Sequence, residues 1–447
     1  MQWTQLLSTQ RFAANQNQVY KTQTPSSEEG KEALRSDFLI DYDRIVFSSA
    51  FRRLGRKTQV HPLAQHDHIH NRLTHSVEVA SVGRSLGNRV GVMLLNGGFL
   101  PKHHTPLDIG QVVQVACLAH DLGNPPFGHT GEDALRDWFT QPTHQIFLEG
   151  LTNTQKADIQ TYEGNAHSLR MVANLEMYQN QGGMRLSAAT IGTLLKYPWT
   201  SSHPLGTKKF SIYQTELPFI QHIAKELGLP EQQTENHWAR HPLSYLMEAA
   251  DDICYAILDL EDAVEIGLLE EKELENILSQ IDFTERTWQA KGSKQRCAML
   301  RGIAIGKCIE EVAQKFMMHH DSLLNGNLPV KDLLSVCNAQ VSNTLAAAKE
   351  LAYNKIYRHR DKLVTEIAAY PCIATILDLL IPAVFMKVRN EPIPARLQLA
   401  LELLKETPIE QDDTLYNAYM KVLDFIGAMT DNTAAKMARE LSGVGII

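Results

Sequence analysis

The sequence predicts an all-α fold, because helical patterns alternate with short loops along the chain and strand signals are almost absent. Apolar residues recur at helical spacing in several stretches, as at Leu73, Val77, Val82, Leu86 and Val90. Glycine and proline breaks separate these stretches, and the chain shows no sequence repeat and no low-complexity tract. Its 447 residues are too many for one simple core, so we expect two or three lobes or one large helical domain with insertions.

The composition is ordinary for a soluble globular protein, with 44% hydrophobic and 21% charged residues. No uninterrupted run of about 18 apolar residues indicates a transmembrane helix, and the first residues lack the basic and apolar regions of a signal peptide. The six cysteines form no Cys-x-x-Cys motif, and Cys117 and Cys254 lie in apolar helical runs that predict buried thiols. We therefore expect a cytoplasmic protein with no membrane partner.

The net charge of −8 excludes a general nucleic-acid coat, which needs a broad basic surface. A polyanionic substrate is still compatible with this charge, because cations gather locally. These local groups are Arg52, Arg53, Arg56 and Lys57, followed later by Lys196, Lys208 and Lys209. A solvated charged surface is the alternative interpretation of each group.

The first predicted helices flank a histidine-rich loop. Residues 1–35 are polar, with a loop predicted at residues 25–30. Ser36-Asp37 can then cap a helical pattern over residues 43–54. A polar stretch dense in histidine follows. Residues 74–90 then hold a helical apolar period, which places His75 in the first turn of a helix.

The next predicted helix is buried and ends in two candidate ligands. Asp108 is a good N-cap for it, and residues 109–118 are apolar almost all round. Its last turn delivers the adjacent pair His120-Asp121 before Gly123 ends it. Burying an aspartate is costly unless its charge is compensated, and a metal ion would compensate it. A chance His-Asp dipeptide is the alternative.

A further helix is predicted to begin near Thr130. Thr130 and Asp133 resemble a capping box, and Glu132 lies in the first turn, where the helix dipole alone also favours a carboxylate. A polar insertion follows at residues 140–160. One amphipathic helical pattern follows residues 162–167. Further helical patterns cover residues 187–195, 270–278 and 429–441.

A long helix opens near His241-Pro242 and carries a polar stripe. Asp251, Tyr255 and Asp259 are spaced four residues apart and therefore share one face. The residues between them are largely apolar, which indicates that much of the helix is buried. The stripe suits the wall of a cavity, and a solvent-facing stripe is the alternative.

Three predicted helices therefore each offer metal ligands. They are His75, the His120-Asp121 pair, and one carboxylate of the Asp251-Asp252 pair. Two imidazoles and two carboxylates can hold one divalent ion with positions open for water. Such an ion lowers the pKa of bound water and polarises a phosphoryl oxygen.

This ordered pattern of His, His-Asp and Asp on helices resembles the HD phosphohydrolase superfamily. Longer motifs are similar to those of its deoxyguanosine triphosphate triphosphohydrolase (dGTPase) family. The matching stretches are residues 71–75, 120–129, 162–166 and 248–253, with further similarity at 3–7 and 425–430. The resemblance thus spans nearly the whole chain.

The resemblance implies an HD-domain helical core with additional helical lobes. Residues 1–60 would be an N-terminal segment that contributes to the active site. Residues 61–270 would form the HD-domain core with the metal site. Residues 271–447 would be a C-terminal helical region, partly packed on the core and partly in oligomer contacts.

The resemblance also implies the metal ligands and the catalytic pair. Asp251 is the fourth ligand in place of Asp252, because the family's offsets of four and eight then fall on polar residues of the same face. His129 and Glu132 match the catalytic histidine and its acidic partner. The implied ligands are His75, His120, Asp121 and Asp251.

Other matching positions imply substrate contacts. The residues that would grip the sugar are Gln59, Val60, Tyr255 and Asp259, of which Val60 and Tyr255 would crowd a 2′-hydroxyl. The residues that would contact phosphates are Arg72, Asn124, Lys196 and Tyr197. Three more residues lie in a matching motif without an individual role, namely Glu163, Asn165 and His167.

The implied reaction is hydrolysis of a deoxynucleoside triphosphate, dGTP or other dNTPs, to deoxynucleoside and intact triphosphate. One divalent ion per subunit is implied, Mn²⁺ or Mg²⁺ in the first place, with iron, cobalt, nickel or zinc as alternatives. The alternatives in function are another HD-type nucleotide phosphohydrolase, or a regulatory protein that senses dNTPs or single-stranded DNA with low turnover.

The family also implies partners beyond the substrate. Its members assemble as tetramers or hexamers, so we expect a homo-oligomer. Some members respond to a second nucleotide or to single-stranded DNA. The cationic cluster Arg358-His359-Arg360 can belong to such a second site or to an ordinary surface patch.

Overall fold

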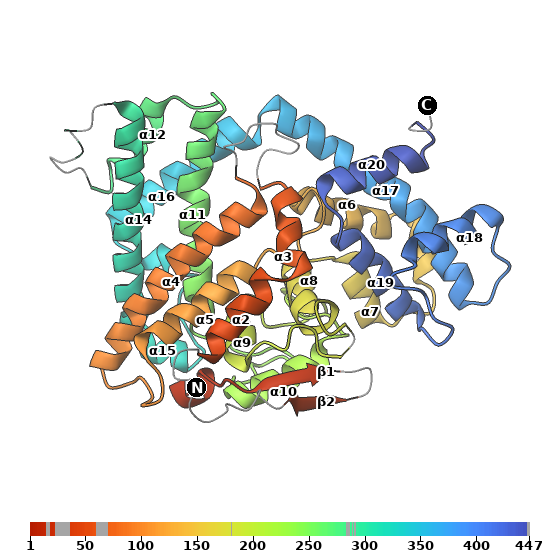
Figure 1. Ribbon diagram of the computed structural model, residues 1–447, viewed down its shortest axis with the longest axis horizontal. Helices are drawn as coiled ribbons and strands as arrows, with labels where there is room; N and C mark the ends of the chain where they lie inside the picture. Colours follow the sequence, from red (N-terminus) through yellow and green to blue (C-terminus); the bar gives the residue numbers. More distant parts are fainter. Residues whose placement is uncertain are drawn as a thin grey trace.

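A computed structural model describes residues 1–14, 18–22, 36–59, 70–179, 181–282, 287, 289 and 292–444. Over these residues the fold is almost entirely helical, so the all-α prediction is confirmed (Figure 1). The exception is a two-stranded antiparallel hairpin of β1 (Arg11–Ala14) and β2 (Val19–Thr22), in which Arg11 pairs with Thr22. The sequence did not predict it, because strands of four residues are too short to establish an alternating pattern.

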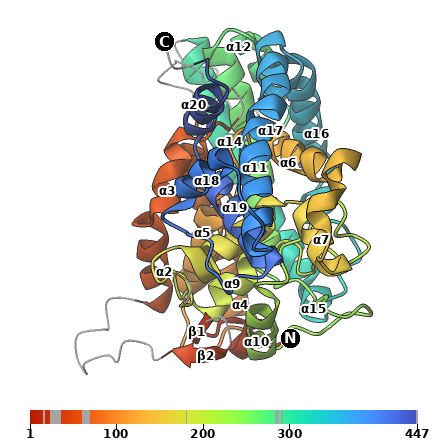
Figure 2. The ribbon, with the colours of Figure 1, turned by 90° about the vertical axis from the view of Figure 1, so that its right-hand side faces the viewer.

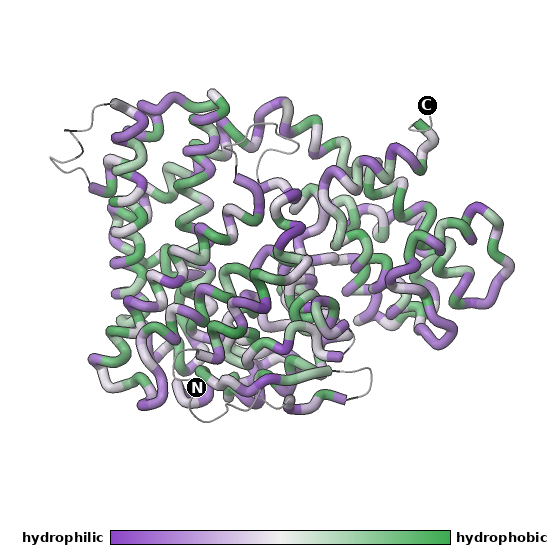
Figure 3. The backbone as a smooth tube through the Cα atoms, viewed as in Figure 1, coloured by the Kyte–Doolittle hydropathy of each residue, from purple (hydrophilic) through white to green (hydrophobic). Residues whose placement is uncertain are grey.

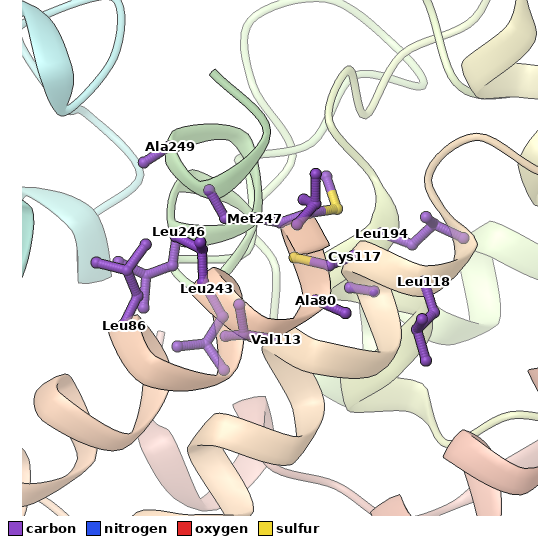
Figure 4. Close-up of a cluster of buried hydrophobic side chains, with 14 of the residues drawn as sticks. Ala80, Leu86, Val113, Cys117, Leu118, Leu194, Leu243, Leu246, Met247 and Ala249 are labelled. Atoms are coloured by element: carbon purple, nitrogen blue, oxygen red, sulfur yellow. The ribbon is translucent and has the colours of Figure 1, made fainter. Parts of the chain in front are cut away.

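Three helices pack against one another in the left half of the molecule as drawn in Figure 1. They are α4 (Arg72–Asn96), α5 (Pro106–Ala119) and α11 (Ser244–Glu265). Figure 4 shows their apolar side chains meeting, with Leu86 from α4, Val113 and Cys117 from α5, and Leu246 and Met247 from α11. The apolar helix predicted near residues 109–118 is therefore central and buried.

Close packing of α4 on α5 depends on glycines. Gly83, Gly87 and Gly91 recur every four residues and so share one face of α4. A Cβ atom built on Gly87 would lie 2.7 Å from Gly110 Cα, and one on Gly91 would lie 2.7 Å from Pro106 Cα. Because no side chain separates the two backbones there, the ends of α4 and α5 that carry His75 and His120 are held in a fixed relation.

A first hydrophobic core surrounds these three helices. Nine further helices of the described residues contribute to this core alone. They are α1 (Trp3–Leu6), α2 (Asp37–Val46), α3 (Ser49–Arg53), α9 (Ala188–Leu194), α10 (Leu217–Leu227), α12 (Glu271–Leu278), α14 (Ser293–Met318), α15 (His320–Leu324) and α16 (Ala339–Ala352).

A second hydrophobic core gathers the C-terminal helices, which lie on the right in Figure 1 and face the viewer in Figure 2. Its helices are α6 (His129–Thr140), α7 (Asn153–Gln160), α17 (Arg360–Val388), α18 (Ala395–Leu401), α19 (Leu415–Gly427) and α20 (Asp431–Leu441), and α8 (Gly164–Arg170) contributes to both cores. Residues 134–166 thus pack with residues 373–434. The division of the chain at residues 60 and 270 stays a prediction.

Several predicted helix starts are displaced by a few residues. Ser36 caps α2 as expected, since its Oγ accepts from Leu39 N at 3.2 Å. The single helix expected over residues 43–54 is interrupted, because Ser48 caps a new helix, α3. The predicted N-cap at Asp108 is wrong: Thr105 precedes the helix, and Asp108 takes the third position of that capping box.

The start of α6 differs in the same way. It begins at His129, directly after Gly128, so the predicted capping box of Thr130 and Asp133 is wrong. Phe127 and Gly128 both have positive φ angles, 65° and 60°. This tight turn brings His129, instead of Thr130, to the first position of the helix.

Apolar and polar residues alternate along most helices, as Figure 3 shows. Within the described residues, Lys362–Val388 of α17 is the one stretch long and apolar enough to cross a membrane, with a mean hydropathy of 1.9. Glu366 and Asp378 interrupt it, and half of its most apolar part is buried inside the protein. Its length and composition are weak evidence for a membrane span, because a core helix of a soluble protein meets the same criteria.

Candidate metal centre and active site

The four predicted metal ligands meet at one point. The ligating atoms of His75, His120 and Asp121 all lie within 4.8 Å of one another. Asp251 Oδ1 lies 3.2 Å from His75 Nε2 and 3.6 Å from His120 Nε2. The first turn of α4, the end of α5 and the middle of α11 therefore supply two imidazoles and two carboxylates to one small volume.

The charges in this cluster compensate one another. Burial alone would lower the pKa of His120, but Asp121 and Asp251 raise it to about 9. Burial would raise the pKa of Asp121, but Arg72 and His120 lower it to about 2. The pKa of Asp251 is held well below its usual range against burial, chiefly by His120. Both carboxylates are therefore ionised.

The tautomer of His120 suits a metal ligand. Its Nδ1 lies 2.6 Å from the carbonyl oxygen of Cys117, and because a carbonyl only accepts, Nδ1 must donate. Nε2 is therefore the nitrogen that faces Asp121 and Asp251, and it would present its lone pair to a metal ion that displaces its proton. The donor set of two imidazoles and two carboxylates thus fits a divalent cation of intermediate hardness.

A cavity of about 490 Å³ opens beside the cluster. Three of the four ligands line it, namely His75, Asp121 and Asp251, together with Arg72. His129 lines the same cavity. The volume lies in the range of small-molecule binding sites, and three of the ligands share this cavity with the predicted catalytic histidine.

His129 and Glu132 form a hydrogen-bonded pair in the first turn of α6. His129 Nδ1 lies 3.1 Å from Glu132 Oε2, and the His129 side chain is 76% exposed whereas that of Glu132 is 2% exposed. The second oxygen, Glu132 Oε1, accepts from Gly164 N at 2.7 Å. A buried carboxylate thus orients an accessible imidazole, which is the arrangement that general acid–base catalysis needs.

Two partly exposed cations and a second buried carboxylate surround this pair. Arg136 and Lys209 lie 3.6 Å and 3.7 Å from Glu132 Oε2, and 3.2 Å and 3.0 Å from Glu163 Oε2. Burial would raise the pKa of Glu132, but His129 and Lys209 hold it well below its usual range. The pKa of Glu163 shifts upward instead, because of burial and the nearby Glu132. The pKa values of the two neighbouring carboxyl groups are therefore shifted in opposite directions, and that of Glu132 is the one held low.

The chain resembles known proteins in the segments that build this site. A family model for the HD domain matches residues 72–161, which contain His75, His120 and Asp121. A deoxyguanosinetriphosphate triphosphohydrolase-like protein of Pseudomonas aeruginosa is 45% identical over 419 residues, 92% of this chain and 94% of the relative. The chain belongs to the dGTPase family of HD-domain proteins.

Two more distant members cover the chain as fully. A deoxyguanosinetriphosphate triphosphohydrolase-like protein of Synechocystis is 34% identical over 460 residues, the full length of both chains. A deoxyguanosinetriphosphate triphosphohydrolase of Yersinia pestis is 30% identical over 503 residues, 93% of this chain and 96% of the relative. The likeness to the dGTPase family therefore extends from the first helix to the last.

The residues expected to grip a sugar fall into two groups. Gln59 and Tyr255 line the cavity, and Gln59 Oε1 is buried with no hydrogen-bond partner among the described residues. Asp259 does not line it, because its buried carboxylate accepts from the Tyr357 hydroxyl. Val60, the fourth dGTPase-family position, lies outside the described residues.

The residues expected to contact phosphates are also divided. Arg72 lines the cavity while it donates to Asp121 Oδ2 at 2.8 Å. Asn124 lies behind the ligands and donates to Asp121 Oδ1. Lys196 Nζ lies 3.5 Å from Glu248 Oε1, and neither Lys196 nor Tyr197 lines the cavity.

The motif around Glu163 lies behind the catalytic pair. Glu163 caps α8 and accepts from Asn165 Nδ2 at 2.6 Å. His167 is fully buried, and neither of its ring nitrogens has a hydrogen-bond partner among the described residues. None of the three residues lines the cavity.

One wall of the cavity was not predicted from the sequence. Residues on the π-helical turn Tyr353–Tyr357 and on the first turns of α17 form it. Tyr357 stacks on Tyr255 with 5.9 Å between ring centroids and 10° between planes. Lys362 and Glu366 follow on α17. Nothing in the local spacing marks these residues, since they lie about a hundred positions from the residues they face.

Proposed function

We propose that this protein hydrolyses deoxynucleoside triphosphates, dGTP and other dNTPs, to deoxynucleoside and inorganic triphosphate. The observation that carries the proposal is that His129, backed by the buried Glu132, lines the same cavity as His75, Asp121 and Asp251. The relatives named deoxyguanosinetriphosphate triphosphohydrolase support the choice of substrate. In the reaction, water attacks the α-phosphorus and the 5′-oxygen leaves.

The residues that would hold the metal are His75, His120, Asp121 and Asp251. We propose Mn²⁺ or Mg²⁺, one ion per subunit, because two carboxylates and open positions for water suit these ions. When bound there, the ion would act as a Lewis acid, which polarises a phosphoryl oxygen and lowers the pKa of bound water. Arg72 keeps Asp121 ionised and ready to coordinate.

His129 is the residue that transfers a proton during hydrolysis. Its Nδ1 is engaged with Glu132, so Nε2 is the nitrogen that reaches reacting groups in the cavity. The Glu132 carboxylate holds the ring in this orientation and stabilises the imidazolium while it carries the proton. Arg72 and Lys196 would neutralise charge on the phosphates, Lys196 after exchanging its contact with Glu248.

The sugar would be read by residues of the same cavity. Gln59 Oε1, a buried acceptor without a partner among the described residues, suits the 3′-hydroxyl of a deoxyribose. Tyr255, with Val60, would crowd the 2′ position and disfavour a ribonucleotide. Asp259 would join the 3′-hydroxyl contact if the Tyr357 hydroxyl yields its place.

The test is a product analysis with isotope-labelled water. The protein is incubated with each dNTP and with GTP in Mn²⁺, and the products are resolved by chromatography and phosphorus NMR. We expect deoxynucleoside and intact triphosphate, with GTP consumed more slowly. In water enriched in oxygen-18, attack at phosphorus places the label in triphosphate.

Other products would overturn the proposal. Pyrophosphate or monophosphate would indicate another nucleotide phosphohydrolase of the superfamily. Tight dNTP binding without turnover in any divalent metal would favour a regulatory protein that senses nucleotides or single-stranded DNA. The Asp251→Ala protein is the control for contamination, because turnover that persists in a preparation of it without bound Mn²⁺ would come from a contaminating phosphatase.

We further propose a cytoplasmic homo-oligomer, a tetramer or hexamer, in which a second nucleotide or single-stranded DNA regulates activity. All six cysteines are free thiols, which suits a reducing compartment. Light scattering with and without dNTP tests the assembly, and a monomer under both conditions would contradict it.

A further inference from the structure

The carboxylate of Asp431 joins two separate segments of the active site. Asp431 lies at the first position of α20 and is 2% exposed. Its Oδ1 accepts from Phe127 N at 2.9 Å, and its Oδ2 accepts from Thr58 N at 2.9 Å. One side chain near the C-terminus therefore binds backbone groups about 300 and 370 residues earlier in the chain.

Each donor adjoins a residue that the proposed reaction uses. Thr58 directly precedes Gln59, and Phe127 precedes His129 by two positions. All four of these residues line the cavity. Asp431 thus fixes the backbone on both sides of the space that the substrate would occupy.

The turn at Phe127 needs such an anchor. Phe127 has a φ angle of 65°, which is uncommon for a residue with a side chain and costs free energy unless the surroundings enforce it. The hydrogen bond from its N–H to a buried carboxylate provides that constraint. Loss of the carboxylate would free the turn that delivers His129.

A second buried side chain ties the same segments together. The Lys57 ammonium group is buried and donates to the carbonyl oxygens of Asn124 and Gly427, at 2.5 Å and 2.6 Å. Residues 427–431, between α19 and α20, are thereby connected twice to the loop before His129. The corner between these two helices is the common support of both active-site segments.

Asp431 does not cap α20, so helix capping does not explain why its carboxylate is buried. The N-cap of α20 is Thr430, whose Oγ1 accepts from Thr433 N at 3.2 Å. Both oxygens of Asp431 are directed instead to N–H groups outside the helix. A residue that only started the helix would not need a buried carboxylate bound to two distant segments.

We propose that Asp431 is a positioning residue that sets His129 and Gln59 from the C-terminal helix α20. The proposal rests on the proposed function, in which His129 transfers the proton and Gln59 contacts the sugar. It makes the position of α20 a determinant of the catalytic rate, although α20 contributes no side chain to the wall of the cavity among the described residues.

Asp431→Asn is the variant that tests this proposal, and Thr430→Ala is its matched control. The amide oxygen can accept a hydrogen bond from one of the two N–H groups, but the amide NH₂ would face the other donor. The turn at Phe127 or the backbone at Thr58 should therefore shift. We expect kcat to fall about ten-fold or more, because small displacements of a catalytic group are costly. Thr430→Ala weakens the start of the same helix and should leave kcat within about two-fold.

A double-mutant cycle separates positioning from general structure. In the His129→Ala background, Asp431→Asn should cause no further loss of kcat, because the group that it positions is gone. An increase in KM from displacement of Gln59 should persist in that background. Equal losses of kcat in both backgrounds, or equal effects of Asp431→Asn and Thr430→Ala, would overturn the proposal.

Hydrogen exchange keeps the proposal testable if no dNTP is turned over or if the variant folds poorly. In the wild-type protein, the amides of Thr58 and Phe127 should be protected, and rapid exchange there would overturn the proposal. In folded Asp431→Asn protein, peptides that contain these two amides should exchange at least ten-fold faster. Peptides of α4, and the Mn²⁺ content, should remain as in the wild type.

Discussion

Asp251 and Asp252 are adjacent on α11 but have different surroundings. Asp251 Oδ1 contacts both His75 and His120, whereas Asp252 Oδ2 lies 3.3 Å from Lys349 Nζ. Burial raises the pKa of Asp252, while that of Asp251 is held well below its usual range. The two carboxylates are therefore a matched pair for testing which one binds the metal.

We expect Asp251→Ala to abolish both metal binding and turnover. Removal of this carboxylate leaves one acidic ligand, and loss of a ligand charge weakens a divalent site severely. Asp252→Ala should still bind Mn²⁺, even if it changes substrate binding. Mn²⁺ content after gel filtration, measured by mass spectrometry, checks both variants. A fully active Asp251→Ala protein with bound metal would remove Asp251 from the ligand set.

His129→Ala should keep the metal and lose rate. His129 lies outside the four-ligand cluster, and its imidazole contributes only to proton transfer, which is worth about 10²- to 10⁴-fold in rate. Glu132→Gln should also lower kcat, since the amide can accept from only one of His129 Nδ1 and Gly164 N and no longer stabilises the charge of the ring. Loss of Mn²⁺ from His129→Ala would contradict the separation of the metal site from the catalytic pair.

At the scale of elements, the contact of α4 with α5 sets the distance between the two histidine ligands. We expect Gly87→Ala to cost about 1–3 kcal/mol of unfolding free energy, because a methyl group placed 2.7 Å from Gly110 Cα forces the helices apart. Mn²⁺ affinity should fall with it, as His75 moves away from His120.

Gly302→Ala is the control for that substitution. Gly302 lies inside α14, and a Cβ atom there meets nothing within 4 Å. Alanine should be neutral or stabilise the helix by up to about 1 kcal/mol. Chemical unfolding and Mn²⁺ titration of both variants measure the difference. Equal behaviour would show that the glycine face of α4 does not set the metal site.

His70 links α4 to α11 by charge. Its Nε2 lies 3.0 Å from Glu78 Oε1, and its Nδ1 contacts Asp262, which also accepts from His70 N at 3.1 Å. Hydrogen bonds to Asp262 and Glu78 raise the pKa of His70 to about 10, from an ordinary 6.5. Because the pKa of His70 is higher in the folded protein than in the unfolded chain, its protonation stabilises the folded state. This contribution is complete below pH 6.5 and is lost as the pH rises toward 10.

His70→Gln should therefore destabilise the protein in a pH-dependent way. Glutamine keeps hydrogen-bonding groups but carries no charge, so we expect a loss of about 2–3 kcal/mol at pH 6. The gap from the wild type should narrow steadily between pH 7 and pH 9.5. Urea unfolding across this range measures it. A gap that does not change with pH would show that His70 is not charged in the folded protein.

Helices could be predicted from the sequence where an apolar period extends over many residues. Elements that depend on contacts between residues far apart in the sequence could not. The apolar periods of α4 and α11 identified both helices and placed His75 and Asp251 correctly on them. The hairpin of β1 and β2 was not predicted, because its strands of four residues are too short to show an alternating pattern. Helix starts shifted by one to three residues, since Thr105 and Gly128 compete with Asp108 and Thr130 as first residues.

The site was partly predictable for the same reason. Two imidazoles and two carboxylates in recognisable motifs predicted the ligand set, and the structure brings them together. The wall formed by Tyr357 and Lys362 was not predictable, because it arises when residues after 350 fold back over α11. The burial of Glu163 and His167 behind the cavity likewise depends on packing that no local pattern encodes.

At the scale of the whole molecule, the cavity lies where the two hydrophobic cores meet. The metal ligands belong to helices of the first core, whereas His129 begins α6, which packs in the second core. Lys57 and Asp431 span this junction through buried hydrogen bonds. Relative movement of the two cores would therefore change the distance between the metal and the catalytic histidine.

Metal removal should lower the stability of the whole protein. The folded state gathers Asp121 and Asp251 beside His75 and His120, whereas the unfolded chain has no such site. An ion that binds only the folded state adds about 2.7 kcal/mol at a hundred times its dissociation constant. We expect wild-type protein to unfold at a higher temperature in Mn²⁺ than in EDTA, and Asp251→Ala to show no difference between the two. If both proteins respond equally to EDTA, the stabilising ion is bound somewhere other than this cluster, and the ligand set proposed here is wrong.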